Sequence, residues 1–259
     1  MKSPIRIVGL VALAAAFARA EEPKPAEHVL CEGAWRIDTD DKDARTVGVY
    51  KVRGERNAGN GEILIREEME RVQKDGVRMG YRSLVVYREG TPPVPVRAEA
   101  ETWVDGQPTM KGTITFADGK MDWECTGFWD PDKQTAIDPP SRTEKKGVEV
   151  PEGVVLFQSA VAVLGPLLLA ENGKETPVVW VEFPDDIEAP ELVVVKTGRV
   201  LKRRKADTDG SFVIEVCSES RVTRDYVLDA RNQILSLGSQ GRGKIVRVGW
   251  DYRMPEKSD

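Results

Sequence analysis

The sequence predicts a mainly β protein in which an antiparallel curled sheet, a half-barrel, wraps one apolar helix in the middle of the chain. Strand-like segments follow one another from about residue 45, and two Asp-Gly pairs mark hairpin turns. One long apolar run, residues 154–170, interrupts the strands. With 40% hydrophobic residues and six tryptophans among 259 residues, the composition is that of a folded chain.

The clearest strands form a meander around the two Asp-Gly pairs. Residues 94–104 alternate in polarity and end at Asp105-Gly106, and residues 110–116 end at Asp118-Gly119. A third segment follows from residue 121 to residue 127. Because Asp-Gly favours the tight turn that joins neighbouring antiparallel strands, we expect these three segments to lie side by side.

Residues 62–72 fit two periodicities. Ile65, Met69 and Val72 have helical spacing, whereas Ile63, Ile65, Glu67 and Met69 alternate as in a strand. Turn signals on both sides of the segment favour the strand.

The middle of the chain divides the strands into two halves. Residues 130–151 contain four prolines and a charged stretch, and we interpret them as a long loop. Residues 154–170 are apolar almost all round, which predicts a buried helix, with either a kink or the start of a short second piece at Pro166. Strands resume from residue 178. The expected organisation is one domain over residues 45–253 with a short tail, residues 254–259.

The first twenty residues predict an export signal. Lys2 and Arg6 precede an apolar run over residues 7–17, and Ala18-Arg19-Ala20 supplies small residues for cleavage. The run is shorter than the about 20 residues that a membrane-spanning helix needs. We therefore expect cleavage after Ala20, a periplasmic or extracellular protein without a membrane span, and a flexible leader over residues 21–44.

The charge of the chain argues against two classes of partner. The formal net charge is −5, and cleavage would remove Lys2, Arg6 and Arg19 but no acid, which makes it −8. Nucleic acids and anionic membrane surfaces attract proteins with a positive field. We therefore expect neither as a bulk partner.

Few side chains are available for catalysis. His28 is the only histidine, and it falls in the expected leader, so neither a serine or cysteine triad nor a histidine-bound zinc is expected. No glycine-rich phosphate loop is present, and we expect no cofactor. The pairs Glu99 with Glu101 and Asp185 with Asp186 could serve glycoside hydrolysis. Among 43 acidic residues, however, such pairs are typical of a solvated strand face.

Two further groups of residues allow alternative interpretations. Cys125 and Cys217 lie in strand-like segments and could form a disulfide in an exported protein, or all three cysteines could be buried and reduced. Residues 202–205, Lys-Arg-Arg-Lys, could contact phosphates or a lipid head group, but we favour protection of a sheet edge against aggregation.

The order of elements, with an apolar helix at residues 154–170 and a closing strand–turn–strand at residues 226–235, resembles the lipoprotein-carrier-like half-barrel proteins of the bacterial periplasm and their relatives of unknown function. That resemblance implies a hydrophobic groove between sheet and helix, with an acyl chain or a lipoprotein as ligand. Phe157 and Leu164 on the helix are its expected lining, and Trp129 at a strand end is a further binding candidate.

Three functions remain open at the level of sequence. The first is a non-enzymatic exported protein that binds a lipid or acyl chain in this groove. The second is a structural or interaction module of the cell envelope whose core is filled by its own side chains. The third is a carboxylate-dependent enzyme acting on carbohydrate. The sequence leaves the ligand and the oligomeric state open.

Overall fold

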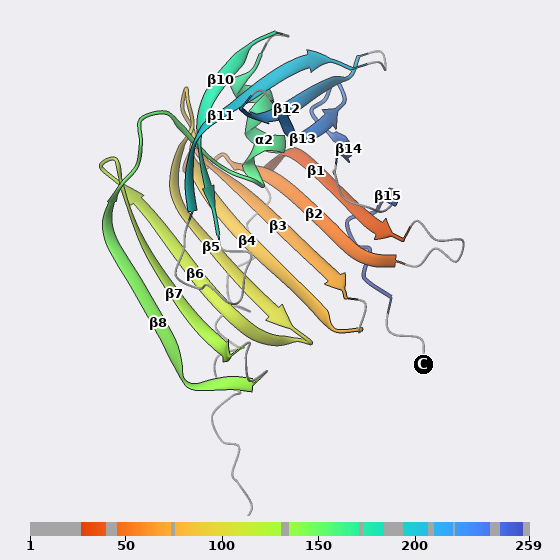
Figure 1. Ribbon diagram of the computed structural model, residues 1–259. Helices are drawn as coiled ribbons and strands as arrows, with labels where there is room; N and C mark the ends of the chain where they lie inside the picture. The colour runs from red at the N-terminus through yellow and green to blue at the C-terminus, as the bar shows by residue number, and fades with distance from the viewer. Residues whose placement is uncertain are drawn as a thin grey trace, which may run out of the picture.

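The computed structural model describes residues 27–39, 46–73, 76–130, 135–170, 173–183, 194–206, 210–219, 221–238 and 244–255. These residues form two sheets and one helix (Figure 1). The expectation of a mainly β, largely antiparallel fold around an apolar helix is confirmed, and a second sheet is added to it. The export signal expected over residues 1–20 lies outside the described residues.

The first sheet has nine strands in the order β15-β1-β2-β3-β4-β5-β6-β7-β8. Every pair of adjacent strands except β15 and β1 is therefore consecutive in sequence. Every pair in it is antiparallel. The strands are β1 (Glu27–Asp38), β2 (Thr46–Asn57), β3 (Glu62–Val72), β4 (Arg78–Arg88), β5 (Val94–Val104), β6 (Gln107–Ala117), β7 (Lys120–Asp130), β8 (Thr135–Glu149) and β15 (Lys244–Val248).

The second sheet has six strands in the order β14-β13-β12-β11-β10-β9. Its β9–β10 pair is parallel, and helix α2 (Ala160–Leu168) connects these two strands. The strands are β9 (Val154–Phe157), β10 (Glu175–Glu182), β11 (Val194–Lys205), β12 (Phe212–Ser218), β13 (Arg221–Leu228) and β14 (Ile234–Gly238).

Helix α2 lies between the two sheets (Figure 1). On one side, a Cβ at Gly54 of β2 would lie only 2.3 Å from Cγ1 of Val163, so Val163 occupies the space that the glycine leaves. On the other side, Gly165 lies against Ile214 of β12. Burial on both sides explains why the helix carries no polar face.

The apolar run at residues 154–170 is only partly helical, contrary to the sequence prediction. Its first residues, Val154–Phe157, form β9, and the helix begins after Ser159. A segment buried on all sides has no polarity period, so its residues do not distinguish a buried strand from a buried helix. Pro166 lies inside the helix, near its end.

Three other expected boundaries are wrong. The leader expected over residues 21–44 contains β1, whose Trp35 is 1% exposed in the core. The loop expected over residues 130–151 contains β8, an edge strand, where proline is tolerated because one side needs no hydrogen bond. The tail expected over residues 254–259 includes Met254, which is buried.

The chain near its C-terminus packs on the outer face of the first sheet. The Lys51 ammonium donates a hydrogen bond to the Trp250 carbonyl at 2.7 Å, and Lys51 and Arg53 both lie over the Trp250 ring. Arg78 of β4 donates to the Pro255 carbonyl. This segment therefore covers the buried Lys51 side chain.

The basic run at residues 202–205 does not protect an edge, because β11 is an interior strand between β10 and β12. Lys202 pairs with Glu175, and Arg204 pairs with Glu215. Arg203 stacks on Phe212 and donates to the Leu169 and Ala170 carbonyls, at 2.9 and 3.2 Å, where α2 ends. A cation is favourable at this helix end.

We predict that Arg203→Gln lowers the free energy of unfolding by about 1–2 kcal/mol, because two carbonyls at the helix end lose a charged donor. The matched control is Arg204→Gln, which removes the same charge from an exposed neighbour and is expected to cost no more than about 1 kcal/mol. Urea denaturation of both variants measures the difference. Equal stability of the two variants would contradict the assigned role of Arg203.

Candidate functional site

The second sheet and α2 cover one end of the first sheet and leave part of its inner face less covered (Figure 1). Side chains under the second sheet are buried, including Ile65 of β3 and Val85 of β4. Further along the same face, the side chains are only half-buried. We call these half-buried residues the concave floor: Met69, Met79, Tyr81, Val104 and Trp129.

Strand register brings the floor residues together. Met69 pairs with Tyr81 across β3 and β4, and Met79 pairs with Val104 across β4 and β5. Trp129 follows Trp123 and Cys125 at every second residue of β7, so it points to the same inner face. The floor therefore spans several strands, and its apolar side chains lie beside Arg71, opposite Met79, and Thr102, opposite Tyr81.

The three expected groove residues do not line one groove. Phe157 is 3% exposed and packs against the rings of Phe116 and Phe183, and Leu164 is fully buried. The interface between helix and sheet is thus filled at these positions by the protein's own side chains. Trp129, in contrast, is half-buried on the concave floor, at some distance along β7 from the residues under the helix.

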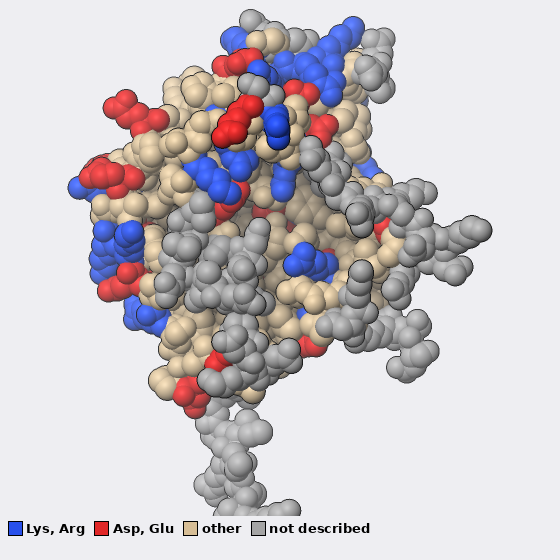
Figure 2. All heavy atoms as spheres, viewed as in Figure 1, with Lys and Arg blue, Asp and Glu red and all other residues tan. Residues whose placement is uncertain are grey.

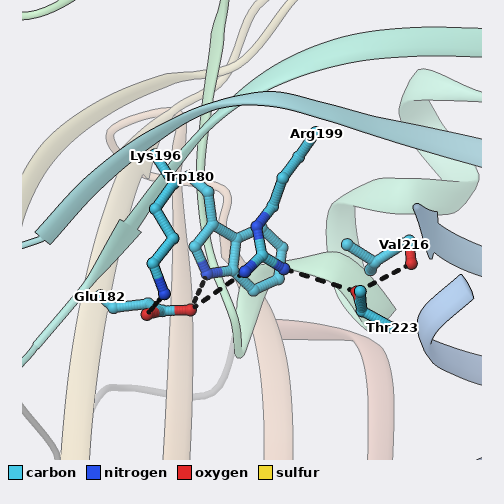
Figure 3. A network of polar contacts seen from close by, with 6 residues as sticks. All are labelled: Trp180, Glu182, Lys196, Arg199, Val216 and Thr223. Carbon is cyan, nitrogen blue, oxygen red and sulfur yellow. Dashed lines mark hydrogen bonds and ion pairs between the residues drawn. The ribbon is translucent and has the colours of Figure 1, made fainter. Parts of the chain in front are cut away.

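A polar network lies at the end of the second sheet, where β10 ends and β11 begins (Figure 3). Its members are Trp180, Glu182, Lys196, Arg199 and Thr223. The Glu182 carboxylate accepts hydrogen bonds from the Lys196 ammonium at 2.6 Å and from the Trp180 indole nitrogen at 2.5 Å. Burial raises the pKa of Glu182, but these two bonds and the charges of Lys196 and Arg199 outweigh it and lower the pKa overall. Glu182 is therefore ionised at neutral pH.

Arg199 lies over the Trp180 ring, with its guanidinium carbon 4.7 Å from the ring centroid. Its polar contacts with described residues are long: 3.8 Å to the Glu182 carboxylate and 3.5 Å to the Thr223 hydroxyl (Figure 3). The side chain is only 15% exposed. Stacking on the ring and burial fix the orientation of the guanidinium before any ligand binds. Its N–H groups make only weak hydrogen bonds to the described residues.

A second polar cluster lies between the first sheet and β13, and it contains Tyr50, Glu67, Arg224 and Tyr226. The Tyr50 hydroxyl donates to the Glu67 carboxylate at 2.7 Å in a buried position, and burial together with this carboxylate raises the pKa of Tyr50 well above its usual value. Burial opposes the charge on Arg224, but Tyr226, Tyr50 and Glu67 raise its pKa overall. Because Arg224 is next in sequence to Thr223, this cluster adjoins the polar network.

Lysine and arginine side chains gather above a hollow in the face turned to the viewer in Figure 2. Lys196 and Arg199 supply two positive charges to the network, against one negative charge on Glu182. The described members of the network thus carry one net positive charge, in a chain whose formal net charge is −5.

Of the two acidic pairs considered for glycoside hydrolysis, the structure describes Glu99 and Glu101. Glu99 forms an ion pair with Arg97 at 2.9 Å, and Glu101 forms one with Arg82 at 2.6 Å, on the outer face of the first sheet. This is the solvated strand face that the sequence favours. Asp185 and Asp186 lie outside the described residues. His28, at the start of β1, is exposed.

The cysteines form no disulfide, so the suggested Cys125–Cys217 pair is wrong: the two lie in different sheets, and both are buried. Burial raises the pKa of the Cys31 thiol to about 12 and that of Cys125 to about 11, so neither is a thiolate at neutral pH. Within the described ranges, no three His, Cys, Asp or Glu side chains are grouped to hold a metal ion. Nor is any helix in these ranges long and apolar enough to cross a membrane.

The polar network could not be anticipated from the sequence. Trp180 and Glu182 stand two residues apart on a predicted strand, which is the only local signal. Lys196, Arg199 and Thr223 reach them through the pairing of β10 with β11 and through the hydrogen bond to β13.

No protein-family model matches this chain, and no curated protein matches it. A solved structure to which the chain is similar is the β-barrel-like protein of domain of unknown function DUF1849 from Brucella abortus. The sequence identity is 13% and the TM-score is 0.41, and the match covers 85% of this chain and 97% of that chain.

Proposed function

We propose that the chain is an exported, non-enzymatic binding protein for an amphiphile, a lipid or a related molecule with one acyl chain. The acyl chain would lie on the concave floor and the polar end of the ligand would lie at the polar network. The observation that carries this proposal is the half-buried apolar floor beside a locally positive network. The site differs from the helix–sheet groove of the lipoprotein-carrier-like resemblance, because Phe157 and Leu164 are already enclosed.

Burial of an acyl chain on the floor would contribute enough free energy to hold a lipid. Each methylene group that leaves water contributes about 0.8 kcal/mol to binding. Met69 and Met79 of the floor have unbranched, adaptable side chains, which suit an acyl chain of variable shape. The charge of the network would then set the orientation of the ligand.

A second function is favoured by a different observation. The core between the second sheet, α2 and the first sheet is filled by the protein's own side chains, as Val163 over Gly54 illustrates. A filled core is expected of an interaction module of the cell envelope that binds another protein and no small molecule. On this alternative, the protein carries no lipid at any stage.

The two functions are separated by native mass spectrometry of residues 21–259, the expected mature protein, purified after export. We expect an additional mass that is lost on denaturation and is identified as a lipid. The delipidated protein should take up added laurate, and Trp129→Ala should weaken this uptake. A bare protein mass together with no uptake of laurate would contradict lipid binding and favour the interaction module.

A further inference from the structure

We propose that Lys196 and Arg199, with the Trp180 ring as the support on which Arg199 lies, form a recognition site for an oxyanion, the carboxylate or phosphate at the polar end of the amphiphile. This inference rests on the proposed function and names the head-group chemistry that the site would select. An amphiphile with a neutral or cationic head would be excluded from this position.

The network already holds one carboxylate. Glu182 accepts hydrogen bonds from the Trp180 indole nitrogen and the Lys196 ammonium on its two oxygens (Figure 3). Two donor groups, one from β10 and one from β11, therefore converge on one carboxylate. Charge-assisted hydrogen bonds of this kind are stronger than neutral ones.

Arg199 is the donor that Glu182 leaves largely unused. Its contacts at 3.8 Å and 3.5 Å are too long for strong hydrogen bonds. Because the guanidinium is fixed on the Trp180 ring, its planar fork can receive two oxygens of a carboxylate or phosphate with little loss of side-chain freedom. The network also has one more positive than negative charge, which a bound anion would neutralise.

The strand that carries Glu182 ends over the inner face of the first sheet. Phe183, the residue after Glu182, lies 3.5 Å from the position of a Cβ on Gly112 of β6. Two residues along β6, on the same face, Met110 pairs with Thr102, which in turn pairs with Tyr81 of the floor. β10 thus ends over the sheet face that carries the floor, and on this proposal an amphiphile whose head contacts Arg199 extends its chain along that face.

The test compares three ligands with the same chain: laurate, lauryl phosphate and lauryl alcohol. Binding to the delipidated protein, residues 21–259, is measured by titration calorimetry below the micelle concentration. We expect laurate or lauryl phosphate to bind about tenfold or more tightly than the alcohol, because a charged hydrogen bond contributes at that level. The preferred anion identifies the head group as carboxylate or phosphate.

Variants then assign the selectivity to the site. Arg199→Gln should reduce the advantage of the anionic ligands to about twofold or less and leave the alcohol unchanged, whereas Arg204→Gln, the matched change on the same strand, should alter neither. If Arg199→Gln does not fold, Lys196→Gln, at a more exposed position, replaces it.

The outcomes separate the inference from the proposed function. Equal binding of all three ligands, or an anionic preference that survives both Arg199→Gln and Lys196→Gln, would overturn the oxyanion site and leave amphiphile binding intact. No binding of any of the three would contradict both.

Discussion

Replacing Leu164 by alanine is expected to lower the free energy of unfolding by about 2–5 kcal/mol, the range for large-to-small changes in a core. Leu164 lies in the centre of α2, between the two sheets, and its side chain is 0% exposed to solvent. Removing its methyl groups leaves a cavity that the enclosed helix can close only in part. Urea denaturation followed by tryptophan fluorescence measures the change.

The control for this prediction lies three residues away on the same helix. Leu167 is 45% exposed, so Leu167→Ala should cost less than about 1 kcal/mol. Laurate binding should change less than about twofold in Leu164→Ala, because the ligand is placed outside the helix compartment. A large loss of laurate affinity with little loss of stability would instead place the acyl chain between helix and sheet.

Gly54→Ala is expected to destabilise the protein by about 1–3 kcal/mol through overpacking. The new Cβ would approach Cγ1 of Val163 to 2.3 Å and Cγ2 to 2.7 Å, so the helix or the strand must move. Gly112→Ala is the matched control on the same face of the same sheet, since its Cβ meets nothing closer than 3.5 Å. The control should change stability by less than about 1 kcal/mol.

A double-mutant cycle tests the contact itself. Val163→Ala removes the two methyl groups that the new Cβ would meet. We expect Gly54→Ala to cost at least about 1 kcal/mol less when Val163 is already alanine, because the two sites share one space. Strict additivity of the two substitutions would show that α2 does not sit on Gly54 as described.

The parts of the fold that depend on local sequence were predictable. Asp105 and Gly106 have φ values of 46° and 77°, and Asp118 and Gly119 have 51° and 72°. These positive values are what the Asp-Gly hairpin signal requires. The meander β5–β6–β7 therefore follows from short-range chemistry, and the strand chosen for residues 62–72 is confirmed as β3.

The errors arose where tertiary contacts decide the local structure. Val154–Phe157 became a strand because β10 pairs with it in parallel, a contact that no local pattern signals. In strand β1, the inward Gly33 carries no side chain and leaves space for the Trp35 ring, so the apolar side of the alternation is short there. Strand β8 was missed because its prolines and charges are typical of loops as well as of edge strands.

The candidate site was predictable only in its aromatic part. Trp129 was identified by its place at a strand end, whereas Phe157 and Leu164 proved to be core residues. The polar network joins β10, β11 and β13, so its five side chains come together only through sheet pairing and a bulge between β10 and β11.

The central claim is that the acyl chain lies on the concave floor, and a brominated fatty acid tests it most directly, because bromine quenches tryptophan fluorescence on contact. We predict quenching in the unchanged protein that is largely lost in Trp129→Phe. The quenching should persist in Trp103→Phe, because the Trp103 ring packs against Gly80 on the outer face of the first sheet, away from the floor. Quenching that is equally strong without Trp129, or absent from the unchanged protein, would contradict the claim.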